Sequence, residues 1–201
     1  MGNYVNEIIT RVMPKVFDLL KYPNNKKFYC IGFENSIHYY EMTKNDFLNS
    51  QIESIGEASM QNIPSILEKI LNKLPTDSNI NILTLSNGEI EDHTQTLNNV
   101  ESLYKKLNGN YNNINSKVIL FNSNKADTLA LCSLLQFNSL EHSNEKNLTI
   151  FNPNNSNLNN DEVDNFSKLI ALLFPFLLSE WEIQSIKKNL RIEPNEKLLT
   201  N

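Results

Sequence analysis

The 201-residue sequence has few of the residues that mark common catalytic or metal sites. Its five glycines, at positions 2, 32, 56, 88 and 109, are too scattered to form a glycine-rich loop around a phosphate. Its two cysteines, Cys30 and Cys132, lie in apolar runs, which indicates buried thiols rather than a disulfide framework or a zinc knuckle. The three histidines lack the spacing of zinc ligands, and no Gly-x-Ser-x-Gly nucleophile elbow is present. These absences argue against nucleotide, zinc and hydrolase chemistry.

Clustered basic charge and long apolar runs are also scarce. The 18 Lys and Arg are dispersed among 23 Asp and Glu, which leaves a net charge of −5 and no basic stripe for nucleic acid. The apolar stretch LIALLFPFLL is about half of the ~20 residues that a membrane span requires, and Pro175 interrupts it. No signal peptide is evident. We therefore expect a cytoplasmic protein that binds neither nucleic acid nor membrane.

The sequence is rich in asparagine, most densely over residues 152–160, which we attribute to codon bias. Hydrophobic residues make up 40% of the chain, enough for a substantial core. Strand-like and helix-like patterns alternate along it. We predict helices over residues 5–20, 59–74, 94–107, 126–137 and 161–178, and strands over 79–86, 116–122 and 147–152, with two further strands around a turn at 34–36. Residues 180–201 are polar and are predicted to be a linker or the start of a following segment.

This alternation predicts an α/β fold, a doubly wound and mostly parallel sheet with helices on both faces. The strand NINILTLS is continuously apolar, as expected for a parallel strand that is buried on both faces. In such sheets ligands bind at the carboxyl ends of the strands. The loops that directly follow the strands are therefore the candidate functional regions.

Three stretches, taken in order, resemble the von Willebrand factor A domain, the fold shared with integrin inserted domains. LTLSNGEIED is similar to the end of that family's fourth strand, which runs into Thr/Ser-Asp-Gly-Glu. SIGEASMQNIPSIL is similar to its Gly-Gly-Thr-x-Met loop and the helix that follows. The opening MGNYV resembles the Met-Gly that often follows the family's first strand and its Asp-x-Ser-Gly-Ser motif. The resemblance covers residues 1–179, a von Willebrand A-like domain of Rossmann-like order.

The resemblance also implies that the first, central strand is missing. In the family this strand lies between those predicted here at 27–33 and 80–86, so its absence would leave two strand edges exposed. We therefore expect the natural protein to extend upstream of Met1 and to carry companion domains.

The family implies a metal-ion-dependent adhesion site at the carboxyl edge of the sheet, and this sequence matches it poorly. The aspartate and two serines of the family's first loop have no counterpart here. Its threonine falls on Ala58, beside Ser59, and its second aspartate falls on Asn87. Mg²⁺ gives up its water reluctantly, and neutral oxygens compensate for that loss poorly. Ser59 and Asn87 would thus form a vestigial metal site, and we expect no cofactor, with Mg²⁺ possible only in a longer form.

The hypothesis from the sequence is a non-enzymatic protein-interaction module within a larger protein. The residues expected to contact the protein partner lie in two loops at the carboxyl edge: Gly56, Glu57, Ala58, Ser59, Asn87, Gly88 and Glu89. Two alternatives stay open. One is a Mg²⁺-dependent adhesion-type domain that works once the upstream strand is present. The other is a fragment of a Rossmann-like α/β enzyme whose catalytic residues lie elsewhere.

Overall fold

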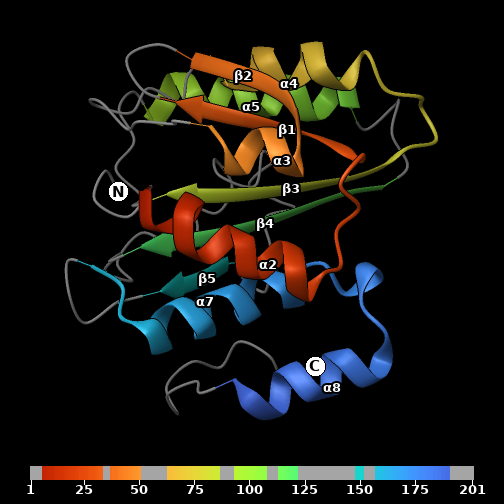
Figure 1. Cartoon of the computed structure of the whole chain (residues 1–201). Coiled ribbons are helices and arrows are strands. Elements are labelled where there is room, and N and C mark those ends of the chain that lie inside the picture. Colours follow the sequence, from red (N-terminus) through yellow and green to blue (C-terminus); the bar gives the residue numbers. More distant parts are fainter. Residues whose placement is uncertain are drawn as a thin grey trace. The chain divides into compact units, whose positions relative to one another are not determined.

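The computed structural model describes residues 6–33, 37–50, 63–86, 93–107, 113–121, 148–151 and 157–190. The chain divides into two compact units. The first comprises residues 1–30, 40–55 and 153–201, and the second comprises residues 31–39 and 56–152. Helices and strands are mixed along the chain, as the sequence pattern predicts for an α/β protein (Figure 1).

The second unit is built on a three-stranded parallel sheet in the order β3-β4-β5 (Figure 1). Its strands are β3 (Asn79–Ser86), β4 (Asn113–Phe121) and β5 (Leu148–Phe151). The register pairs Ser86 with Leu120 and Phe121 with Phe151, so the three strands end at the same edge of the sheet. The three predicted strands of this region are confirmed, and β4 begins three residues earlier than expected because its asparagines continue the ladder.

Two helices of the second unit, α4 (Ile63–Leu71) and α5 (His93–Leu107), pack with one face of this sheet. The apolar stripes of these two helices supply the core. Alternate residues of β3 and β4 complete the cluster because side chains alternate between the two faces of a strand. The buried cluster comprises Ile63, Leu67, Leu71, Ile80, Val100, Leu103, Val118 and Leu120.

The first unit begins with a helical segment that contains a π-helical turn, η1 (Ile8–Val12), followed by α2 (Met13–Leu19). The backbone N–H of Met13 donates to the carbonyl of Ile8, five residues back. Pro14 has no N–H to donate within the next turn, and a wider turn is one way in which a helix accommodates such a loss. The predicted opening helix is therefore confirmed, with a local irregularity that the sequence pattern does not reveal.

A cluster of aromatic rings fills part of the first unit. The ring of Phe17 on α2 lies 5.4 Å from that of Tyr22, 5.7 Å from that of Phe28 and 6.0 Å from that of Phe47, measured between centroids. Phe47 belongs to α3 (Lys44–Leu48), a short helix that the sequence analysis missed. Tilted and edge-on ring pairs of this kind each add about 0.5–1.5 kcal/mol beyond the area that they bury.

Strands β1 (Lys27–Phe33) and β2 (Ile37–Thr43) form a separate two-stranded sheet whose residues are divided between the two units. In the sequence β1 ends at Phe33 and β2 begins at Ile37, and so short a connection joins antiparallel neighbours. These strands confirm the two predicted around residues 34–36. Neither β1 nor β2 is a hydrogen-bonded neighbour of β3.

The carboxyl-terminal part of the first unit is more helical than predicted. Helix α7 (Asn160–Leu172) ends before Pro175, which starts the 3₁₀ turn η5 (Pro175–Leu177). Within the expected linker, residues 180–189 form α8 (Glu180–Asn189), which contacts α7 and buries Ile186. The helix starts with Ser179 and Glu182 in a capping box, a signal that outweighs the polar composition of the segment. In the part of the chain that the structure describes, no helix is both long and apolar enough to cross a membrane.

Candidate functional site

The carboxyl edge of the β3-β4-β5 sheet is the region to which the sequence assigns function. Because the strands are parallel and in register, the segments that follow Ser86, Phe121 and Phe151 all leave from this edge. The loop after β3 and the loop after β4 therefore begin next to each other. This arrangement was expected from the alternation of strands and helices.

The predicted site residues themselves lie outside the described residues. These residues are Gly56, Glu57, Ala58, Ser59, Asn87, Gly88 and Glu89. The structure fixes only the elements that bound their loops: α4 begins at Ile63, β3 ends at Ser86 and α5 begins at His93. The described residues on either side of positions 87–92 belong to the buried end of β3 and to a helix of the second unit.

Small hydroxyl residues occupy buried positions in the sheet and in α5. Thr84 and Ser86 are buried at the carboxyl end of β3. Thr96 on α5 and Ser116 on β4 are also buried, and neither hydroxyl has a hydrogen-bond partner among the described residues. A buried hydroxyl without a partner costs about 1–3 kcal/mol. Ser116 pairs with Ile82, well before the strand end, so it does not belong to the loop region.

The metal implied by the family resemblance does not fit the residues at the predicted positions. Ala58 offers no side-chain donor, whereas Ser59 and Asn87 offer neutral oxygens without a carboxylate. Mg²⁺ is normally bound through at least one carboxylate. In the described part of the chain, no group of three His, Cys, Asp or Glu side chains is arranged to hold a metal ion. We therefore assign no metal chemistry to this edge.

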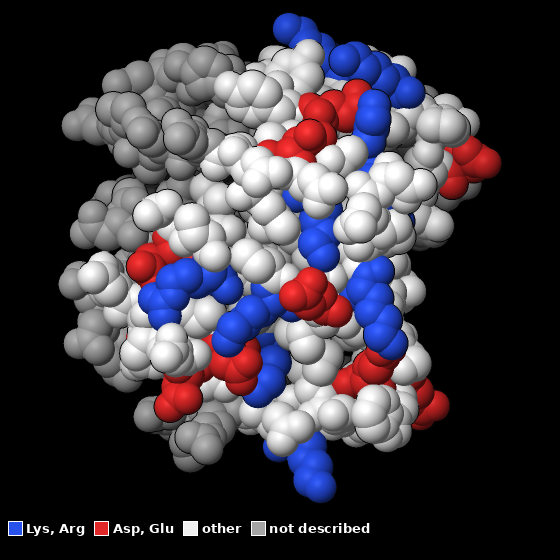
Figure 2. Space-filling model, in the orientation of Figure 1, with Lys and Arg blue, Asp and Glu red and all other residues white. Residues whose placement is uncertain are grey.

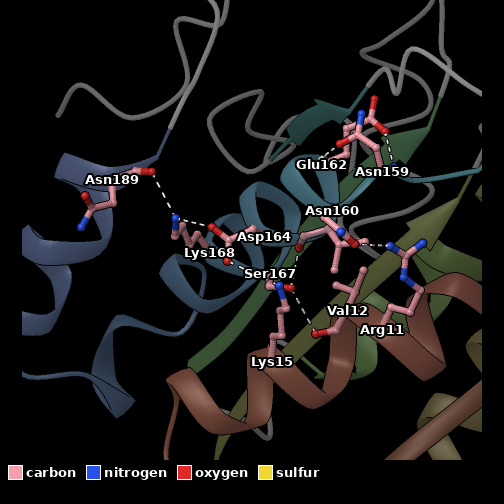
Figure 3. A network of polar contacts seen from close by, with 11 residues as sticks. Arg11, Val12, Lys15, Asn159, Asn160, Glu162, Asp164, Ser167, Lys168 and Asn189 are labelled. Carbon is pink, nitrogen blue, oxygen red and sulfur yellow. Dashed lines mark hydrogen bonds and ion pairs between the residues drawn. The ribbon is translucent and has the colours of Figure 1, made fainter.

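A network of charged and polar side chains in the first unit was not predicted (Figure 3). Asp164 on α7 lies between two lysines: Lys168 Nζ is 2.5 Å from its Oδ2, and Lys15 Nζ is 3.6 Å from its Oδ1. Lys168 also donates to the backbone carbonyl of Asn189 at 3.2 Å. The hydrogen bond from Lys168 lowers the pKa of the Asp164 carboxyl below its usual value, although partial burial opposes this effect. The network joins α2, α7 and the end of α8.

Arg11 makes the second group of contacts in this network (Figure 3). Its guanidinium contacts the Glu7 carboxylate, donates to the carbonyl of Leu158 at 2.6 Å and donates to Asn160 Oδ1 at 2.9 Å. These bonds connect η1 to the start of α7. The signal in the sequence is the spacing of four residues between Glu7 and Arg11 and between Asp164 and Lys168. We interpret the network as structural, because each charged group in it is satisfied within the unit.

Charges of opposite sign are interspersed on the described part of one face of the molecule (Figure 2). On the described part of the face shown in Figure 2, Lys and Arg side chains lie next to Asp and Glu side chains rather than in an area of one sign. Among the described residues, Lys27 Nζ lies 3.1 Å from Glu41 Oε1 and Lys106 Nζ lies 3.0 Å from Glu68 Oε1. A surface of this kind does not provide the row of unpaired cations that follows a phosphate backbone.

Aromatic side chains are exposed near the carboxyl-terminal helix. Trp181 is 76% exposed and Phe176 is 57% exposed, while Phe174 is half-buried and its ring lies 6.1 Å from that of Phe176. The capping box at Ser179 fixes the start of α8 and so places Trp181 on its outer side.

No family model matches the chain, and no curated protein matches it.

Proposed function

We propose that the chain is a non-enzymatic protein-interaction module of the von Willebrand A type, part of a larger cytoplasmic protein. It would hold its protein partner with the loops at the carboxyl edge of a doubly wound sheet. The metal-dependent contact of the family would be replaced by direct contacts from two loops: Gly56, Glu57, Ala58, Ser59, Asn87, Gly88 and Glu89.

One structural observation carries most of the support for this proposal. The strands β3, β4 and β5 are parallel and in register, so the segments after them leave from one edge. In parallel sheets, ligands bind to the loops at this edge.

The proposal can be tested by site-specific photo-crosslinking of the chain in extracts of its natural source. A crosslinking amino acid placed at Asn87 or at Ser59 should capture the same protein, identified by mass spectrometry. The matched control is Asp77, an exposed residue at the opposite, amino end of β3. Capture of the same protein from Asp77 with equal yield, or of unrelated proteins from Asn87 and Ser59, would overturn the proposal.

A further inference from the structure

Helix α8 contributes little apolar surface to the core of the first unit. Within Glu180–Asn189 the one buried residue is Ile186, while Ile183 is half-buried and Trp181 is 76% exposed. Helix α7, of similar length, buries seven residues. Segments with little buried apolar surface open locally at a lower free energy than the core does. We therefore expect α8 to be less stable against local opening than α7.

Lysines from outside the helix contact both ends of α8. At its start, Lys21 Nζ lies 2.6 Å from Oε1 of Glu182. At its end, Lys168 Nζ donates to the backbone carbonyl of Asn189 at 3.2 Å and lies 2.5 Å from Asp164 Oδ2 (Figure 3). An ammonium group near the last carbonyls of a helix is favourable because the helix dipole is negative there. The two lysines thus link α8 to the segment after α2 and to α7.

The backbone of Lys21 has a conformation that usually belongs to glycine. Among the residues that the structure describes, Lys21 is the one non-glycine residue with a positive φ, 47°. Its N–H donates to the carbonyl of Asp18 at 3.1 Å, and the N–H of Tyr22 donates to that of Phe17 at 2.9 Å, which closes the end of α2. Glycine is preferred at this position because a Cβ is unfavourable there. The lysine found instead has a side chain that reaches Glu182, and such a backbone outlier points to a role for that side chain.

We propose that α8 is a strap that leaves and rejoins α7 as a whole while the rest of the first unit stays folded, and that the Lys21–Glu182 ion pair holds it closed. Opening exposes the inner stripe of the helix, Ile183, Ile186 and Leu190, which recurs at helical spacing. Because the Lys21 side chain is largely exposed, salt screens the pair and favours the open state. The strap contains none of the residues assigned to the carboxyl-edge loops, so the inference does not depend on the proposed function.

Hydrogen–deuterium exchange of the full chain tests this inference helix by helix. After correction for intrinsic rates, the hydrogen-bonded amides of α8 should exchange faster than those of α7 and at rates similar to one another, because they open together. An increase in NaCl from about 0.1 M to about 1 M shortens the Debye length from about 10 Å to about 3 Å. This increase should speed exchange in α8 at least about twofold and leave α7 unchanged.

Substitutions at Lys21 separate a strap from an ordinary helix end. Lys21→Gln removes the ion pair and should speed exchange in α8 by about two- to fivefold, whereas Lys21→Arg keeps the charge and should keep the rate. Lys26→Gln is the matched control, since this exposed lysine lies over the ring of Tyr22, and it should leave α8 unchanged. Lys21→Gly gives the sharpest contrast. Glycine suits the backbone at this position, so the amides at the end of α2 should exchange no faster while those of α8 exchange faster.

Several outcomes would overturn the inference. One is that the amides of α8 exchange as slowly as those of α7, and another is that they exchange in order from the last residue inward, as in fraying. The inference also fails if exchange in α8 does not respond to salt, or if Lys21→Gln and Lys26→Gln affect it equally. Equal acceleration of α2, α7 and α8 by Lys21→Gly would show that Lys21 acts on the whole unit and would likewise contradict the strap.

Discussion

Burial separates two phenylalanines that the sequence pattern does not distinguish. Phe166 on α7 is fully buried, whereas Phe176 in η5 is 57% exposed. Removal of a buried aromatic side chain typically costs about 3–5 kcal/mol, since the lost contacts are combined with an unfilled cavity. Phe166→Ala should therefore lower the free energy of unfolding in urea by that amount. Phe176→Ala is the matched control and should change it by less than about 1 kcal/mol. Similar losses for the two variants would contradict the assignment of α7 to the core.

The ionised Glu182 carboxylate makes the stability of the chain depend on pH in the acid range. It lies 2.6 Å from Lys21 Nζ and accepts from the Ser179 backbone at 2.8 Å. Its pKa is lowered from 4.5 to about 2, chiefly by Lys21 and then by the Ser179 hydroxyl and backbone. A folded-state pKa below the unfolded one means that the carboxylate contributes stability above about pH 4.5 and loses it as the pH falls toward about 2.

Melting temperatures across this pH range test that contribution. Glu182→Gln should melt below the unmodified chain at pH 7, and the difference should disappear as the pH falls from about 4.5 to about 2. The neighbouring Glu180→Gln makes the same chemical change in the first turn of α8 without removing the contact to Lys21. A difference between Glu182→Gln and the unmodified chain that persists at pH 2 would show that the effect does not come from ionisation.

Three helices of the first unit begin with a capping box. In α3, α7 and α8 the residue before the helix, Thr43, Asn159 or Ser179, accepts from a backbone N–H three residues later. The acidic residue at that later position accepts in return from the first residue's backbone N–H. These reciprocal bonds satisfy donors that a helix start leaves free.

Helix α8 depends on its cap more than α7 does, since Ile186 is its one buried residue. Ser179→Ala should destabilise it by about 0.5–2 kcal/mol, the usual cost of a lost N-cap. Hydrogen exchange of the amides in the first turn of α8 would report this as faster exchange confined to that helix. Ser185→Ala, a change within the same helix, should leave the first-turn amides unaffected. Equal acceleration by both variants would contradict a role for the cap.

The same elements show which helices and strands could be predicted from the sequence and which could not. Strands such as NINILTLS and the stripe Ile63, Leu67, Ile70 and Leu71 were predictable because burial repeats with the period of the element. Helices α3 and α8 were missed because their apolar content is low and their caps carry the signal. The π turn in η1 depends on hydrogen bonds around Pro14, which an apolar pattern does not encode.

At the scale of the whole molecule, the alternation of strands and helices predicted the parallel β3-β4-β5 sheet and its common carboxyl edge. The residues assigned to binding at that edge, including Ser59 and Asn87, lie outside the described residues, so their role stays a prediction. Sequence periodicity reports how each strand is buried but not what lies beside it.

The most direct test of the account is the affinity of the crosslinked partner for variants of the carboxyl edge, measured in Mg²⁺ and in EDTA. The double variant Glu57→Ala with Glu89→Ala should raise Kd at least about tenfold, which corresponds to about 1.4 kcal/mol. Asp77→Ala, at the amino end of β3, should leave Kd unchanged, and Kd should be the same in Mg²⁺ and in EDTA. Equal weakening by Asp77→Ala, or loss of binding in EDTA, would contradict metal-independent binding at the carboxyl edge.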